Sequence, residues 1–174
     1  MTLTHFPLHP ETPQEGRSLE DLFRGRDIDL KASHARLSAL MAEEGLPYAA
    51  VRTHTYNSRL AQELGKWAVT QPGGEAIHDA IYRAYFVDTV NIGKIEELVR
   101  IAGKAGLNAK AAREVLETRG FQEAVDADWL RARELGISGV PTFVAGPFGL
   151  VGAQPYEMLA RLVEKAREGQ SRAG

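Results

Sequence analysis

The feature that most constrains the fold of this chain is a long run of helix-forming sequence between Lys31 and Gly136. Apolar residues return there every three or four positions, the spacing that places them on one face of a helix. Glycine or asparagine interrupts the pattern where helices commonly end or begin. The clearest stripes lie in residues 37–41, 60–68, 77–85, 95–102 and 121–132. The sequence therefore predicts roughly five or six consecutive helices.

Strand-like sequence flanks this helical run on both sides. Residues 1–8 alternate weakly between apolar and polar types, which is typical of a strand. Beyond the helical run, residues 141–145 are predicted to form a strand, joined by the turn 146–149 to a second short strand in a tight hairpin. Pro155 suits the first position of a last helix. The predicted order is strand, helical block, hairpin and helix.

The size of the chain favours a single domain. Its 174 residues, 44% of them hydrophobic, suffice for one sizeable core, so we expect one domain over residues 1–174. No stretch approaches the roughly 20 apolar residues that span a membrane. Residues 1–10 lack the charged and apolar regions of a signal peptide. We therefore expect no membrane partner and a cytoplasmic location.

The composition argues against several classes of function. The 21 basic and 23 acidic residues nearly cancel, so the excess of positive charge that binds a phosphate backbone is absent. The sequence contains no cysteine, which excludes a thiolate nucleophile and metal sites built from cysteine. His5 and His9 have helical spacing, but Pro7 lies between them and no carboxylate completes a ligand set. We expect no nucleic acid, no metal and no cofactor.

Several short segments resemble, in order, one known family. They are FPLHPETPQEG at 6–16, EEGLPY at 43–48, NSRLAQELGKWA at 57–68, YFVDTVNIG at 85–93 and LGISGVPTFV at 135–144. They resemble the DsbA-type oxidoreductases with a thioredoxin fold, most closely the FrnE-like branch, which is related to 2-hydroxychromene-2-carboxylate isomerases and kappa-class glutathione transferases. The resemblance implies an α/β, thioredoxin-like fold in which residues 31–136 form a helical insert.

The resemblance also implies that the front of the family pattern is missing from this chain. Family members begin with a strand, a turn carrying Cys-x-x-C or a catalytic serine, and a long helix. Because that first strand is central in the sheet, its absence leaves buried backbone groups without hydrogen-bond partners. Each such group lowers the stability of the fold by about 1–3 kcal/mol. Either residues 1–8 pair antiparallel with residues 141–145, or a second chain supplies strands. We expect a homodimer, because the missing helix also leaves core surface exposed.

Candidate binding residues follow from the same resemblance. Gly139, Val140 and Pro141 resemble the family's cis-proline element, whose preceding residue offers its backbone groups to an extended thiol peptide or to glutathione. A trans proline at the start of a strand is the alternative. Asn57 belongs to a segment near the active-site cleft of relatives, although helix capping explains Asn57 and Ser58 equally well. We expect no catalytic residue in this chain.

Three functional hypotheses remain open. The first is a thiol-disulfide oxidoreductase by descent, inactive as it stands because Cys-x-x-C is absent. The second is a non-catalytic, dimeric binding protein that keeps the cleft around Val140. The third is a relative of the glutathione-dependent isomerases and transferases, which is weaker because their catalytic serine would lie in the missing segment.

Overall fold

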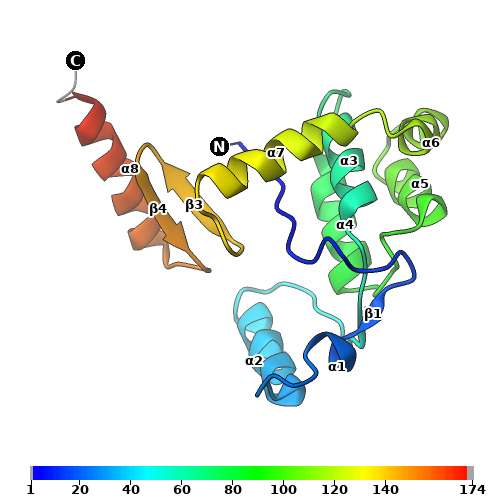
Figure 1. Ribbon diagram of the computed structural model, residues 1–174, viewed down its shortest axis with the longest axis horizontal. Helices are drawn as coiled ribbons and strands as arrows, with labels where there is room; N and C mark the ends of the chain where they lie inside the picture. The colour runs from blue at the N-terminus through cyan, green and yellow to red at the C-terminus, as the bar shows by residue number, and fades with distance from the viewer. Residues whose placement is uncertain (1, 172–174) are drawn as a thin grey trace. The chain divides into compact units, whose positions relative to one another are not determined.

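The computed structural model describes residues 2–171, with side chains through Gly169. The helices are α1 (Leu19–Leu22), α2 (Leu30–Glu43), α3 (Arg59–Ala68), α4 (Ala76–Phe86), α5 (Ile95–Lys104), α6 (Ala109–Thr118), α7 (Gln122–Glu134) and α8 (Tyr156–Ser171) (Figure 1). The strands are β1 (Arg17–Ser18), β2 (His54–Thr55), β3 (Thr142–Ala145) and β4 (Phe148–Val151). The chain divides into two compact units, His9–Asp126 and the combination of Met1–Leu8 with Ala127–Gly174.

The larger unit, His9–Asp126, is built around the helices that the periodicity predicts. Its core lies among α3, α4, α5 and α6, which Figure 1 shows packed together. Leu64, Ile77, Leu98 and Leu116 are each 0% exposed at its centre. Burial of one such leucine or isoleucine stabilises the fold by about 1.5–3 kcal/mol. The stripes in residues 60–68, 77–85 and 95–102 are therefore faces that form this core, whereas Leu37 and Leu40 of the stripe 37–41 are exposed and lie outside it.

Local signals set several helix ends in the larger unit. The Asn108 side chain accepts a hydrogen bond from the Ala111 N–H at 3.0 Å and so caps the start of α6. Gly106 follows α5 with a φ of +82°, a conformation that residues with a Cβ adopt at a cost. The helices predicted between Lys31 and Gly136 are thus confirmed, together with their asparagine and glycine boundaries.

The smaller unit contains the β3–β4 hairpin and α8. The register pairs Ala145 with Phe148, so the turn has only two residues, Gly146 and Pro147, and the second strand begins earlier than the predicted turn 146–149 allowed. The cause is Gly146, whose φ of +57° supports a tight reversal. α8 packs on the hairpin, with Lys165 Nζ 4.4 Å from the centre of the Phe148 ring.

The expectation of a strand over residues 1–8 is wrong for residues 2–8, which contain no strand. Leu8 N–H donates to the Phe6 carbonyl at 3.1 Å, which bends the chain, and Pro7 has no N–H to offer. His5 N–H donates instead to the Asp128 carboxylate at 2.8 Å. The proposed pairing with residues 141–145 is also absent, because among the described residues β3 pairs with β4 alone.

No helix of residues 2–171 has the length and hydropathy to span a bilayer.

Candidate functional site

Gly139, Val140 and Pro141 lie immediately before β3, in the smaller unit. The Val140–Pro141 peptide bond is cis. Val140 is 51% exposed, and no backbone hydrogen bond to Val140 occurs within the described part of the chain. The position of Gly139 is held by a hydrogen bond in which Thr142 Oγ1 donates to the Gly139 carbonyl at 2.7 Å. The segment therefore presents an accessible, unpaired stretch of backbone that continues into a strand.

The hydrogen-bonding parity of the hairpin shows which backbone groups of β3 face outward. Gly152 N–H donates to the Pro141 carbonyl at 2.8 Å, so this is a hydrogen-bonded pair. In an antiparallel ladder such pairs alternate with pairs that exchange no bond. The pairs Thr142–Val151 and Val144–Gly149 are therefore of the second kind, and their backbone groups point away from each other. Thr142 and Val144 thus direct N–H and C=O groups to the edge of β3 that carries no strand in residues 2–171.

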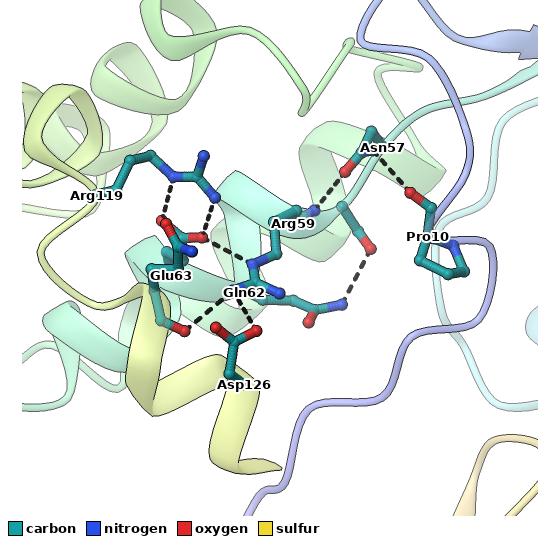
Figure 2. Close-up of polar contacts among 9 residues, drawn as sticks. Pro10, Asn57, Arg59, Gln62, Glu63, Arg119 and Asp126 are labelled. Atoms are coloured by element: carbon teal, nitrogen blue, oxygen red, sulfur yellow. Dashed lines mark hydrogen bonds and ion pairs between the residues drawn. The ribbon is translucent and has the colours of Figure 1, made fainter. Parts of the chain in front are cut away.

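Asn57 lies in the larger unit, at the start of α3, and its side-chain amide is engaged on both sides (Figure 2). Its Nδ2 donates to the carbonyls of Thr12 at 2.7 Å and Pro10 at 3.4 Å. Its Oδ1 accepts from the Arg59 N–H at 2.9 Å, which caps the first turn of α3. Ser58, also a predicted cap, makes no such bond and accepts instead from Gln62 Nε2. Asn57 therefore ties the loop before β1 to α3, and its contact with a ligand stays a prediction.

A buried carboxylate next to Asn57 was not identified from the sequence. Glu63 on α3 is 0% exposed and accepts from Arg119 Nε at 2.8 Å, Arg119 Nη2 at 2.6 Å and Arg59 Nε at 2.8 Å (Figure 2). Arg59 also contacts Asp126 Oδ1 at 2.8 Å. The i,i+4 spacing of Arg59 and Glu63 was visible in the sequence, but Arg119 lies 56 positions further on.

The charges of this cluster determine the ionisation of Glu63. Burial alone raises the pKa of this carboxyl, and it is the largest single influence. Hydrogen bonds and charges from Arg119 and Arg59 together outweigh burial and hold the pKa of Glu63 below 4.5. Glu63 is therefore a permanent anion near neutral pH, paired and without a role for proton transfer. The cluster joins α3 to the segment between α6 and α7 and acts as a structural clamp.

Two further arrangements in the described residues lack the features of a binding site. A surface groove of about 350 Å³ lies between α4 and α5, but its Arg83 already pairs with Asp79 and its Arg100 with Glu97. No group of three or more histidine, aspartate or glutamate side chains within the described residues is arranged to hold a metal ion. Neither arrangement offers chemistry comparable to the unpaired edge beside Val140.

Comparison with known proteins relates these features to one family. A sequence model described as "DSBA-like thioredoxin domain" matches residues 1–164. Among curated proteins, the uncharacterized protein YwbO of Bacillus subtilis (strain 168) is 29% identical over 114 residues, which is 65% of this chain. The match covers 56% of YwbO, so this chain spans little more than half of that relative.

Solved structures share the fold over most of the chain. A probable DsbA oxidoreductase from Streptomyces coelicolor is 31% identical, with a TM-score of 0.81 over 92% of this chain and 72% of that one. The 2-hydroxychromene-2-carboxylate isomerase is 20% identical, with a TM-score of 0.66 over 83% of this chain and 70% of that one. At this second identity the likeness shows the fold alone. The predicted thioredoxin-like α/β class is confirmed.

Proposed function

The chain belongs to the DSBA-like thioredoxin domain family, and we propose that it is a thiol-disulfide oxidoreductase of the FrnE-like branch by descent, which binds an extended thiol peptide but performs no thiol chemistry of its own. Thiol-disulfide exchange needs a thiolate to attack a disulfide sulfur. The sequence contains no cysteine to supply one. What this chain contributes is binding.

The observation that carries this proposal is the unpaired edge of β3. A strand edge with free N–H and C=O groups is a template on which an extended peptide adds as a further strand. Thr142 and Val144 offer such groups, and Val140 continues the same line with no backbone bond within residues 2–171. Val144 is 47% exposed, so a bound peptide would also cover apolar surface.

The reaction arm of the test uses insulin reduction by the purified chain in the presence of dithiothreitol. We expect a rate equal to that of dithiothreitol alone, since no mixed disulfide can form on this chain. A rate above that background would refute the absence of thiol chemistry.

The binding arm uses a matched pair of proline variants in the hairpin. Val144→Pro removes the N–H that points to the free edge of β3, whereas Val151→Pro removes the equivalent N–H on the outer edge of β4. Neither N–H bonds within the hairpin, so both prolines suit an edge strand. With a fluorescein-labelled cysteine peptide, we expect Val144→Pro to weaken binding roughly threefold to tenfold, the equivalent of one hydrogen bond. Val151→Pro should bind as the unmodified chain does.

Two results of this arm would contradict the proposal. One is the absence of saturable binding of the peptide, and also of oxidised glutathione, by the unmodified chain. The other is an equal loss of affinity in Val144→Pro and Val151→Pro, which would mean that the β3 edge is not the binding surface.

We further propose that two copies of the chain associate through this edge when no peptide is bound. Pairing of β3 with its copy would remove both free edges in one symmetric contact. Light scattering should give twice the chain mass of 19.1 kDa, and excess peptide should reduce it to one chain mass, since peptide and partner compete for the edge. A mass of 19.1 kDa without peptide would reject the dimer and leave peptide binding as a separate question.

A further inference from the structure

Arg52, in the segment between α2 and β2 of the larger unit, lies against two aromatic rings. Its guanidinium carbon lies 5.1 Å from the centre of the Tyr85 ring and 5.3 Å from that of Phe86. The two rings meet edge to face at 4.7 Å, so they form two sides of a notch. Such cation–π contacts attract the guanidinium to the rings but supply no hydrogen-bond acceptor for its N–H groups.

No counter-charge among the described residues accompanies this half-buried cation. The half-buried arginines of the described chain are Arg17, Arg52, Arg59 and Arg113. Arg59 pairs with Glu63, and Arg113 pairs with Glu96. Within residues 2–171, Arg17 and Arg52 have no ion pair, and the buried Arg52 Nε has no hydrogen-bond acceptor. A buried donor without an acceptor is unfavourable, and so is a half-buried charge without a partner.

Arg17 belongs to β1 of the same unit. The register of the small sheet pairs Arg17 with Thr55, and the side chains of a directly opposed pair lie on the same face. Thr55 uses that face to contact Tyr85, with its Oγ1 3.0 Å from the Tyr85 hydroxyl. Arg17 therefore extends on the side of the sheet where Tyr85 lies, and where the ring of Tyr85 also holds Arg52.

We propose that Arg17 and Arg52 form a binding site for an oxyanion, a carboxylate or a phosphate group of a small molecule. Arginine presents planar donors that match two oxygens of either group. The aromatic notch positions one guanidinium, and Arg17 adds a second positive charge on the side of the small sheet where Tyr85 lies. The bound anion would provide the counter-charge that these two arginines, unlike Arg59 and Arg113, do not obtain from the described residues, and its oxygens would accept from guanidinium N–H groups other than the buried Nε.

The site is tested on the intact chain with inorganic phosphate and with acetate as probes, by calorimetric titration at an ionic strength held constant with chloride. We expect saturable binding of at least one probe. Tighter binding of phosphate would assign a phosphate group, and tighter binding of acetate would assign a carboxylate. Absence of saturable binding of both probes would refute the site.

Variants locate the binding. Arg52→Gln should weaken it about tenfold or more, since hydrogen bonds to charged groups are about twice as strong as neutral ones. Arg52→Lys should also weaken it, because lysine keeps the charge and loses the planar pair of donors. Arg17→Gln, which removes no cation–π contact found among the described residues, should weaken it without disturbing the notch. The matched control is Arg113→Gln, which removes the same charge from a half-buried arginine that already has a carboxylate partner.

The comparison between these variants decides the question even if one of them folds poorly. If Arg17→Gln and Arg52→Lys both bind as the unmodified chain does, the proposal is wrong and Arg52 only packs on the rings. The same conclusion follows if Arg113→Gln weakens binding as much as the substitutions at Arg17 and Arg52, because the effect would then be one of net charge.

Discussion

Replacing Glu63 with glutamine should lower the free energy of unfolding of the larger unit by about 2–4 kcal/mol. The substitution Glu63→Gln preserves shape and removes the charge at the centre of the clamp. Glu63 is 0% exposed and accepts from both Arg119 and Arg59. Its amide replacement can accept through one oxygen only, and its NH₂ group would face donors.

The magnitude follows from the environment of each partner. Loss of one member of a buried ion pair costs about 3–5 kcal/mol, because the other charge stays buried without compensation. Two features reduce this cost here. The Arg119 side chain is 42% exposed, so water can solvate part of its charge, and Arg59 keeps its contact with Asp126. The lower range of about 2–4 kcal/mol is therefore appropriate.

Urea denaturation followed by tryptophan fluorescence measures this effect in the larger unit alone. The chain has 2 tryptophans, so the background substitution Trp129→Phe leaves Trp67, which is 5% exposed in the core beside Glu63 on α3. Glu117→Gln is the matched control, because Glu117 is 55% exposed and its contact with Arg113 spans 3.5 Å. An exposed pair of this kind contributes about 0–1 kcal/mol.

Acid provides an independent check with a definite sign. Because the folded-state pKa of Glu63 lies below 4.5, its charge stabilises the fold above that pH, and this contribution is lost as the pH falls through the folded pKa. Glu63→Gln carries no such charge. The stability difference between the two proteins should therefore be constant near neutral pH and shrink below about pH 4.5.

The reasoning about the clamp would be refuted by a Glu63→Gln protein whose unfolding free energy lies within about 0.5 kcal/mol of the unmodified protein, which is the range of ordinary surface substitutions. A difference that grows rather than shrinks in acid would be equally damaging, since it would place the pKa of Glu63 on the wrong side of its usual value.

Two further substitutions test close contacts in the larger unit. Gly74→Ala should destabilise it by more than about 2 kcal/mol, because the new Cβ would lie 1.6 Å from the Ala68 carbonyl oxygen. In the control Gly73→Ala the new Cβ meets no atom within 4 Å, so this substitution should cost about 1–2 kcal/mol for its positive φ alone. Thermal melts that rank the two variants in the opposite order would contradict this prediction. Asn57→Asp should cost about 1–3 kcal/mol, since it replaces the amide that donates to the Thr12 carbonyl with a carboxylate that repels it, and an unchanged urea midpoint would show that this tie does not hold the loop.

The helices and the family of this protein could be predicted from its sequence because both depend on local information. A helix closes its hydrogen bonds within the same segment, so periodic apolar residues such as Leu64 and Leu98 predict both the helix and the face that it buries. The short segments that resemble DsbA-type proteins are likewise contiguous, and the match of the family model over residues 1–164 agrees with them. The β3–β4 hairpin could also be predicted from local sequence, since a two-residue turn joins its strands.

Only the tertiary structure decided the features that depend on a distant partner. Residues 2–8 have strand-like alternation and form no strand, because a strand needs hydrogen bonds from another segment and their donors are used elsewhere. In the sequence Glu63 is one of several charged residues on a predicted helix. Its burial depends on Arg119, which lies 56 positions away in the sequence and pairs with it only in the folded chain. Arg52 gave no signal at all, since its place over the ring of Tyr85 results from packing between segments that the sequence does not relate. Local patterns determine which segments are helical, whereas the pairing of charges and strand edges is set by contacts that exist only after the chain has folded.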